Sequence, residues 1–436
     1  MRNRSIRALF VSSTPFAAVA ALGFSALPAL AQDTAPAAPA PSDAKASAAA
    51  PVAAPPITIT GAIEANYTAN FNNPFNGSNT YLYNTNANQF ALNLADLRIG
   101  KAANDTSRVG FFIRLVQGEV ARRNFNTGDN NLLLEGYGTF LVPLKGGKDL
   151  KVDAGQFVTH VGYETIEVGT NNFFSRNFLF QYPSPFYNGG ARASYPVSPK
   201  LTVNGYIYNR FNGFYDPGNT DLAPGFQVVY TPSATTSIVL NGLTSRENLN
   251  AANSVFDGPH TATAPDNRRQ SIVDLIATSQ ISPRFKVVAE GLYRFGDYSQ
   301  PVFGDVTAEA VTLSSLSSRQ AVQIGTRKQS YSVAGGALYG VFTMANGNLL
   351  GLRGEYLSQS KADGPIFQYP TSGDKPNLGS VTLSFEPASS LKLFPGLRTI
   401  LEYRLDFAGK DFFPGKDFGT FKKNQSTITI GQVYNF

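Results

Sequence analysis

The chain has 436 residues, no cysteine and only two histidines, which excludes a disulfide framework and a thiolate metal site. Charged residues make up 15% of the chain, against roughly 25% in ordinary soluble domains, whereas Phe and Tyr together reach 12%. The formal charge is +6, but three arginines lie in a removable leader. The remaining +3 is too balanced to predict binding to nucleic acid.

The first 31 residues have the pattern of a secretion signal. Three early arginines give a positive start, a mostly apolar stretch follows, and Ala29–Ala31 matches an A-x-A cleavage site. An uncleaved anchor is the alternative, but Pro15 and Pro28 interrupt the stretch. The next segment, Gln32–Pro56, consists almost entirely of Ala, Pro, Ser and Thr. Such a segment cannot bury a core, so we expect a disordered periplasmic tether over 32–56.

After the leader, apolar and polar residues alternate with a period of two from Ile57 onward. No apolar run approaches the ~20 residues of a membrane-spanning helix. In the segment 397–407, Tyr403 and its apolar neighbours lie on one face, and Glu402 and Arg404 lie on the other. A helix would scatter these charges around its circumference, whereas a strand collects them on one side.

The alternation and the turn residues together predict sixteen strands. The predicted ranges are 57–70, 88–102, 107–117, 132–143, 149–158, 189–196, 200–211, 223–231, 235–246, 269–281, 284–298, 328–345, 347–358, 376–386, 396–407 and 424–436.

Alternation also fits a soluble β-sandwich, and the connections decide between the two folds. Those after even-numbered strands are short, as at 103–106 and 345–347, whereas those after odd-numbered strands are long and polar. This pattern is typical of a transmembrane barrel with periplasmic turns and external loops, and a sandwich has no reason to show it. A barrel of sixteen strands is wide enough for an aqueous channel. The predicted fold is therefore all-β: a transmembrane antiparallel β-barrel over 57–436, placed in the cell outer membrane by its signal.

The last residues of the chain alternate apolar and polar positions and end in an aromatic residue. Tyr434 and Phe436 resemble the C-terminal signal that the outer-membrane assembly machinery reads. Gln432 departs from this pattern, because that face is usually apolar there. The alternative is an ordinary last strand that happens to end in Phe.

A set of motifs lies between the fifth and sixth predicted strands and just beyond. Gly155–Phe157 ends a strand, Gly162–Glu164 forms a Gly-Tyr-Glu turn, Asn171–Arg176 reads Asn-x-x-x-Ser-Arg, and Pro185–Tyr187 leads to Gly and Arg. In this order they resemble the β-barrel porin type 2 family of outer-membrane proteins. The resemblance implies a barrel with channel function and leaves the solute undefined. The family often has His-Thr before its glycine, where this chain has Asn188.

These motifs fall in the third predicted external loop, near 159–188. In sixteen-stranded general porins the third loop folds into the lumen and narrows it, and the aromatic content of this segment favours packing against the wall. Glu164, Glu167, Arg176 and Arg192 are then candidate pore-constriction residues that present both signs of charge to a solute. Alternatively, these side chains hydrogen-bond the loop to the wall and contact no solute.

Inward positions of the predicted strands also carry charges of both signs. A charge on the lipid face would cost ~2–4 kcal/mol at mid-bilayer, so the alternation places these side chains in the lumen. The predicted lumen-wall residues are Arg98, Arg114, Glu290, Arg294, Arg353, Glu355, Glu402 and Arg404.

Catalysis and metal binding have little support in the sequence. His160 has Thr159 and Glu164 nearby but no nucleophile motif, and His260 lies in a loop turn. We therefore expect neither an enzyme nor a cofactor.

The expected function is a channel for passive diffusion of small hydrophilic solutes or ions. The alternatives are a structural or adhesive barrel closed by its loops, and an anion-selective porin, against which the balanced lumen charge argues. Expected partners are outer-membrane lipid, the barrel-assembly machinery and the solutes, but no nucleic acid. The sequence leaves the oligomeric state open, and a homotrimer is common among general porins.

Overall fold

The computed structural model describes residues 55–124, 133–215, 221–248, 267–304, 322–388 and 394–436. The predicted signal, nearly all of the predicted tether, and His260 lie outside the described residues.

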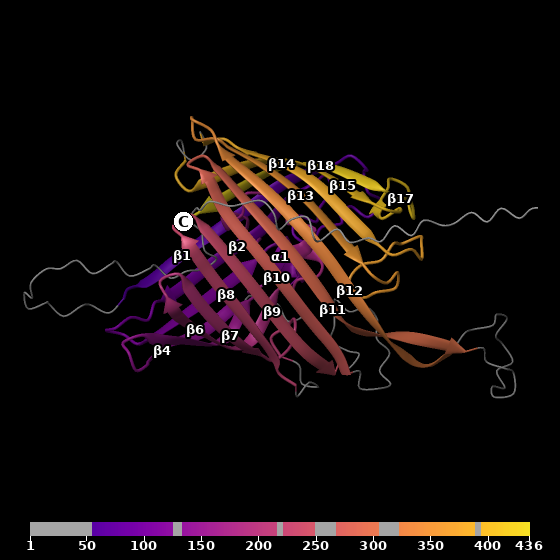
Figure 1. Cartoon of the computed structure of the whole chain (residues 1–436). Coiled ribbons are helices and arrows are strands. Elements are labelled where there is room, and N and C mark those ends of the chain that lie inside the picture. The colour runs from indigo at the N-terminus through magenta and orange to yellow at the C-terminus, as the bar shows by residue number, and fades with distance from the viewer. Residues whose placement is uncertain (1–54, 125–132, 216–220, 249–266, 305–321, 389–393) are drawn as a thin grey trace, which may run out of the picture.

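The described residues form sixteen antiparallel strands that close into one barrel (Figure 1). The barrel strands are β1 (Ile57–Asn70), β2 (Phe90–Lys101), β3 (Val109–Gln117), β4 (Leu133–Pro143), β5 (Asp149–Val158), β6 (Tyr187–Ser198), β7 (Leu201–Tyr208), β8 (Ala223–Ser233), β9 (Thr236–Asn248), β10 (Asn267–Ser282), β11 (Phe285–Gly304), β12 (Val322–Thr343), β13 (Leu349–Gln359), β14 (Asn377–Glu386), β15 (Leu397–Ala408) and β18 (Asn424–Asn435). The predicted fold class is confirmed, and each predicted strand occurs in its predicted order.

The main difference from the predicted strands concerns β11 and β12. The sequence places a loop over 299–327, but Ser299 pairs with Lys328 and the ladder continues to the pair of Gly304 with Val322. The hairpin projects beyond the rim at the end opposite the C-terminus (Figure 1). This part of the ladder contains polar residues and lacks the apolar alternation of a strand inside the membrane. The sequence pattern therefore could not predict the extension of the two strands.

The connections carry short elements that the sequence did not predict. They are α1 (Glu119–Asn124), a 3₁₀ turn (Val168–Thr170), α2 (Phe178–Gln181), β16 (Phe413–Pro414) and β17 (Phe421–Lys422). No helix among the described residues is long and apolar enough to span a membrane.

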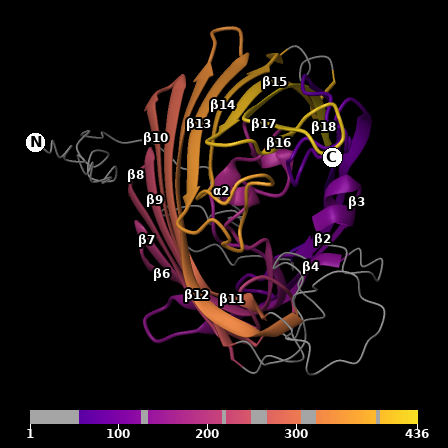
Figure 2. The same cartoon turned by 90° about the vertical axis from the view of Figure 1, so that its right-hand side faces the viewer.

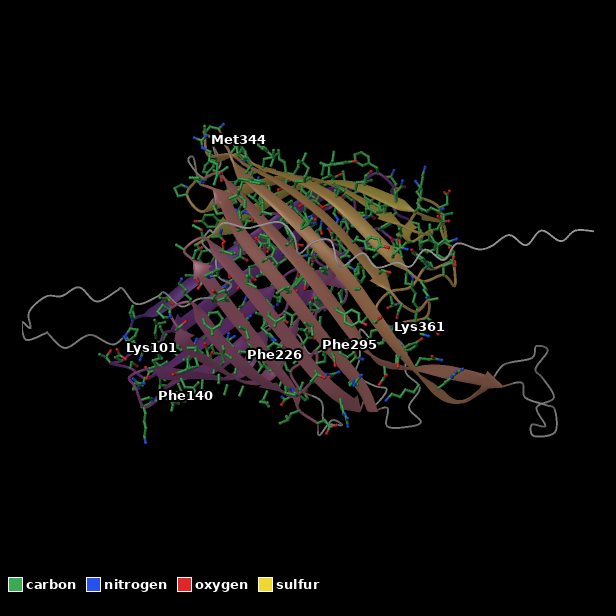
Figure 3. The ribbon with its side chains drawn as sticks, viewed as in Figure 1. Lys101, Phe140, Phe226, Phe295, Met344 and Lys361 are labelled. Carbon is green, nitrogen blue, oxygen red and sulfur yellow. The ribbon has the colours of Figure 1, made fainter. Side chains whose placement is uncertain are left out.

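The outer face of the barrel is a belt of exposed apolar side chains. Phe140, Phe226 and Phe295 lie on the outside of their strands in Figure 3. Leu338 and Leu352 are likewise more than half exposed, although each lies in the middle of a regular strand. Such a surface is stable where lipid covers it, and the alternation of inward and outward side chains produces it.

The barrel closes where β1 pairs with β18. Gly61 and Phe436 exchange two backbone hydrogen bonds, of 2.9 and 3.0 Å. A Cβ at position 61 would lie only 2.5 Å from Cζ of Phe436, so glycine gives the terminal ring its place. Met344, in a short turn, lies at the same end of the barrel as the C-terminus, and Lys361 lies at the other (Figure 3). By the rule for outer-membrane barrels, the end with the short turns is periplasmic.

Candidate functional site

The segment 159–186, here called the inward loop, lies inside the barrel, and Figure 2 shows its helix α2 within the ring of strands. At its base, Thr159 N–H donates to the carbonyl of Phe186 (3.0 Å). At its turning point, Gly169 lies close to Asn435, next to the chain end at the periplasmic side. The loop therefore starts from the external rim and descends through most of the height of the barrel.

Carboxylates on the wall strands accept hydrogen bonds from the backbone of the inward loop. The loop has little secondary structure of its own, so its N–H groups need other partners once buried. Charge-assisted bonds of this kind are stronger than neutral ones. The bonds are Gly162 N to Asp274 (3.0 Å), Tyr163 N to Glu290 (3.1 Å), Val168 N to Glu64 (2.6 Å), Phe174 N to Glu402 (2.8 Å) and Phe178 N to Glu355.

Arginines on the wall strands complete the arrangement by donating to backbone carbonyls of the loop. The bonds are Arg353 to Ser175 (2.9 Å), Arg404 to Arg176 (2.6 Å), Arg398 to Gly169 (2.8 Å) and Asn171 (3.0 Å), and Arg294 to Pro183 (2.9 Å). Carboxylates and arginines together thus replace the strand partner that the loop lacks.

Two of the predicted constriction residues are buried in these contacts. Glu164 is 1% exposed, pairs with Arg353 (2.7 Å) and accepts from Asn177 N (2.6 Å). Arg176 is fully buried and donates to the carbonyls of Thr165 (2.7 Å), Ile166 and Phe174. Their positions match the alternative interpretation, in which they fix the loop and contact no solute. That the loop itself narrows the passage stays a prediction.

Glu167 lies at the deep end of the loop, between two wall arginines. Its carboxylate pairs with Arg114 (2.8 Å) and Arg98 (3.2 Å). Burial by itself would raise the pKa of Glu167, but the charges of Arg114 and Arg98 outweigh it and lower the pKa to about 2. The carboxylate is therefore ionised at neutral pH and is used to anchor the loop.

Arg192 does not belong to the inward loop. It lies on β6, pairs with Asp153 on β5 (2.8 Å), and its guanidinium lies over the rings of Phe157 (4.6 Å) and Tyr137 (4.9 Å). The predicted strand 189–196 already contains Arg192, and β6 places this side chain on the wall rather than on the loop.

Glycines on the wall make room for aromatic rings of the loop. A Cβ at Gly351 would lie 2.9 Å from the ring of Phe173, and a Cβ at Gly431 would overlap the ring of Phe174. Interiors are close-packed, so a ring seated against bare backbone fixes the height of the loop in the barrel.

The eight predicted lumen-wall residues all point inward, in the strand positions that the alternation assigns to them. Seven of them are buried and contact the loop or their neighbours on the wall, and Arg98 is partly exposed. Glu64, Asp274 and Lys151 occupy the same inward positions and are not among the predicted residues. The alternation of β1, β10 and β5 contains the signal that identifies them.

The inward surface of the wall has two parts. The docked wall, on β1 to β3, β10, β11, β13 and β15, consists of the inward residues that hold the loop, such as Glu290 and Arg353. The open wall lies near the periplasmic ends of β5 to β8, where Lys151, Arg192, Asn204 and Gln227 keep partly exposed side chains. If a solute passes through the barrel, it can touch the open wall and the partly exposed Lys286 on β11.

His160 is a packing residue of the loop. Its ring stacks on Tyr206 (centroids 4.0 Å apart), and Nε2 lies 3.3 Å from the carbonyl of Gly242. Burial lowers the pKa of His160 to about 4, so the ring is neutral at neutral pH. In the part of the chain that the structure describes, no cluster of three His, Asp or Glu side chains could hold a metal ion. Asn188, in place of the family's histidine, donates to the carbonyls of Arg210 (3.1 Å) and Phe211 (2.9 Å).

A closed sixteen-stranded barrel with an apolar belt and an inward third loop defines a porin-type outer-membrane protein. The family model described as "Putative beta-barrel porin-2, OmpL-like" matches residues 56–436, so the chain belongs to that family. This places the protein in the outer membrane, as a channel of the porin type.

Solved structures with the same fold have very different sequences. A loop L8 deletion mutant of OmpT, an outer membrane protein of Vibrio cholerae, is 12% identical, with TM-score 0.52, covering 88% of this chain and 100% of that one. An anion-selective porin from Comamonas acidovorans is 8% identical, with TM-score 0.52, and the match covers 87% of this chain and 99% of that one. The high pH structure of Pseudomonas putida OprB is 10% identical, with TM-score 0.51, and the match covers 87% of this chain and 94% of that one. At these identities the likeness shows the fold alone. No curated protein sequence is similar enough to count as a match.

Proposed function

We propose that this porin conducts small hydrophilic solutes or ions passively, and that the inward loop sets the width of the passage. The observation that carries the proposal is the attachment of the loop to the docked wall by charged side chains on both sides of its backbone. A segment held in this way narrows the lumen permanently and leaves the open wall as the remaining side of the passage.

The test replaces residues 166–182 with a short Gly/Ser linker. The wall charges that lose their loop partners are then hydrated in a wider lumen, so we expect the barrel to assemble. Single-channel conductance in planar bilayers should rise, and liposomes should admit larger neutral sugars. A matched control shortens the exposed tip at 416–419, which does not pack in the lumen and should leave both measurements unchanged. Equal conductance in the wild type and the linker variant would contradict the proposed role of the loop.

A structural or adhesive barrel is the second candidate, and one observation favours it. Aromatic residues of other external loops are also buried on the lumen side: Tyr81, Phe367, Tyr369 and Phe413. They cover part of the external mouth. If neither the wild type nor the linker variant conducts, the adhesive or structural function replaces the channel.

We also propose that Tyr434 and Phe436 form the signal for the assembly machinery. Their rings lie on the outer face of the barrel at the end of β18, 44% and 53% exposed, with centroids 6.3 Å apart. Gln432, the departure from the signal pattern, accepts a hydrogen bond from Thr399 (3.0 Å). Deleting Phe436 should leave a periplasmic, protease-sensitive chain, whereas normal heat-modifiable barrel after the deletion would make the motif an ordinary strand end. A homotrimer stays a prediction, which cross-linking of the purified protein can check.

A further inference from the structure

Nearly all acidic side chains of the described lumen wall are buried. Ten of them are at most 6% exposed, because each takes part in a loop bond or an ion pair. They are Glu64, Asp96, Glu135, Asp153, Asp274, Glu290, Glu355, Glu386, Glu402 and Asp406. Asp149, at the periplasmic start of β5, keeps 30% of its side chain exposed but is paired with Arg108. An anion in the lumen therefore meets no exposed carboxylate without a cationic partner on the wall strands whose side chains are described.

Basic side chains of the open wall, in contrast, reach water. The side chain of Lys151 is 37% exposed and that of Arg192 is 27% exposed. Both pair with the carboxylate of Asp153, Lys151 at 3.5 Å and Arg192 at 2.8 Å. This carboxylate also accepts a hydrogen bond from the hydroxyl of Thr139 (2.6 Å). Two cations that share one buried anion leave one positive charge in excess at the water-exposed surface.

A second basic side chain lies near the periplasmic end of β11. Lys286 is partly exposed and donates to the amide oxygen of Asn172 on the inward loop (3.0 Å), and no described carboxylate forms an ion pair with it. The remaining wall clusters add no positive charge of this kind. Arg398 is matched by Glu386 (2.8 Å), and Arg98 belongs to a cluster in which carboxylates outnumber arginines by one.

We propose that the passage prefers small anions to cations, because Lys151, Arg192 and Lys286 provide its exposed, uncompensated charge. The inference rests on the proposed channel function and names the class of solute it favours. The formal balance of lumen charge predicts no preference. Exposure changes this result, since a buried carboxylate is held by its hydrogen bonds or ion pairs and contacts no solute. Fixed charge at a narrow aqueous passage selects for the opposite sign.

The experiment measures the reversal potential of the purified full-length protein in planar bilayers under a KCl gradient. We expect chloride to be more permeable than potassium in the wild type. Lys151→Glu should lower the permeability ratio several-fold, and Lys286→Gln should lower it less. Lys151 is suited to the test because its ion pair among the described residues is with Asp153 on the wall, so its substitution leaves the loop anchors in place. Lys361→Glu, on the exposed external side, is the matched control and should change the ratio least.

The outcomes separate this inference from the function on which it rests. A conducting protein that prefers potassium, or shows no preference, overturns anion selectivity and leaves the channel intact. A chloride preference that Lys151→Glu does not reduce overturns the assignment to the open wall. A protein that conducts nothing overturns both proposals.

Discussion

The docked wall and the open wall belong to the same sheet, with the same alternation and the same kinds of charged side chains, yet their charges differ in what they contact. Glu290 and Arg353 on the docked wall hold the backbone of the inward loop. Lys151 and Arg192 on the open wall pair with Asp153 instead of the loop, and their side chains stay partly exposed to water. The position of one loop thus decides which inward charges are structural and which can meet a solute.

The largest effect is expected where a buried ion pair of the docked wall is broken. Arg353→Met removes the ion-pair partner of Glu164 and one of the two arginines paired with Glu355, and a buried pair that loses one member costs about 3–5 kcal/mol. The loop should become sensitive to protease, and the barrel should lose its heat-modifiable form at lower temperature. Leu352→Met, one position along the same strand on the lipid face, is the control. Identical transitions for both variants would show that the loop is not held by this pair.

The attachment of the loop should also weaken at low pH. Glu167 has a pKa of about 2 against 4.5 for the free group, so its stabilisation is complete above pH 4.5 and is lost as the pH falls to 2. His160 has a pKa of about 4 against 6.5, and stability is lost as the pH falls through that window, because the detached loop binds the proton more strongly. Each group accounts for about 3 kcal/mol. Protease sensitivity of the loop measured from pH 7 to 3 should rise, and His160→Gln should remove the part between pH 6.5 and 4. A flat profile in the wild type would contradict both assignments.

A smaller effect is expected from filling one of the spaces that the loop occupies. Gly431→Ala places a methyl group against the ring of Phe174, and overpacking of this kind costs about 1–3 kcal/mol. Gly354→Ala is the matched control, because a Cβ there meets no atom within 4 Å. The first variant should increase current noise and loop proteolysis, and the second should not. Equal current noise and equal loop proteolysis in the two variants would show that the packing around Phe174 can adjust to the added methyl group.

The smallest effect is expected on the open wall. Asn204 donates to Gln227 (2.9 Å) but is only partly buried, so water can replace this bond. Asn204→Ala should change stability by less than about 0.5 kcal/mol, as measured by heat modifiability. A loss as large as that of Arg353→Met would remove the distinction between the two walls.

The strands could be predicted almost completely from the sequence, because the lipid on one side and the lumen on the other impose alternation at every position of a strand. The partners of the lumen charges could not. The contact of Phe174 with Glu402 joins residues 228 positions apart, and no periodicity encodes it. For the same reason Glu164 and Arg176 looked like charges free to face a solute, although the structure uses them to fix the loop. Exposure at Lys151 and burial at Asp153 likewise follow from the path of the loop and the pairing of β5 with β6.

The separation in sequence between the inward loop and its partners also bears on the order of assembly. The loop precedes β6, yet most side chains that hold it lie on β10 to β15, so it has no receptor until the C-terminal half of the barrel exists. Long-range contacts of this kind form late in folding. The pairing of Gly61 with Phe436 joins β1 to β18, which brings Glu64 and Arg398 to opposite sides of Val168. In a chain stalled before this closure, the aromatic side chains of the loop therefore lack the wall that buries them in the finished barrel.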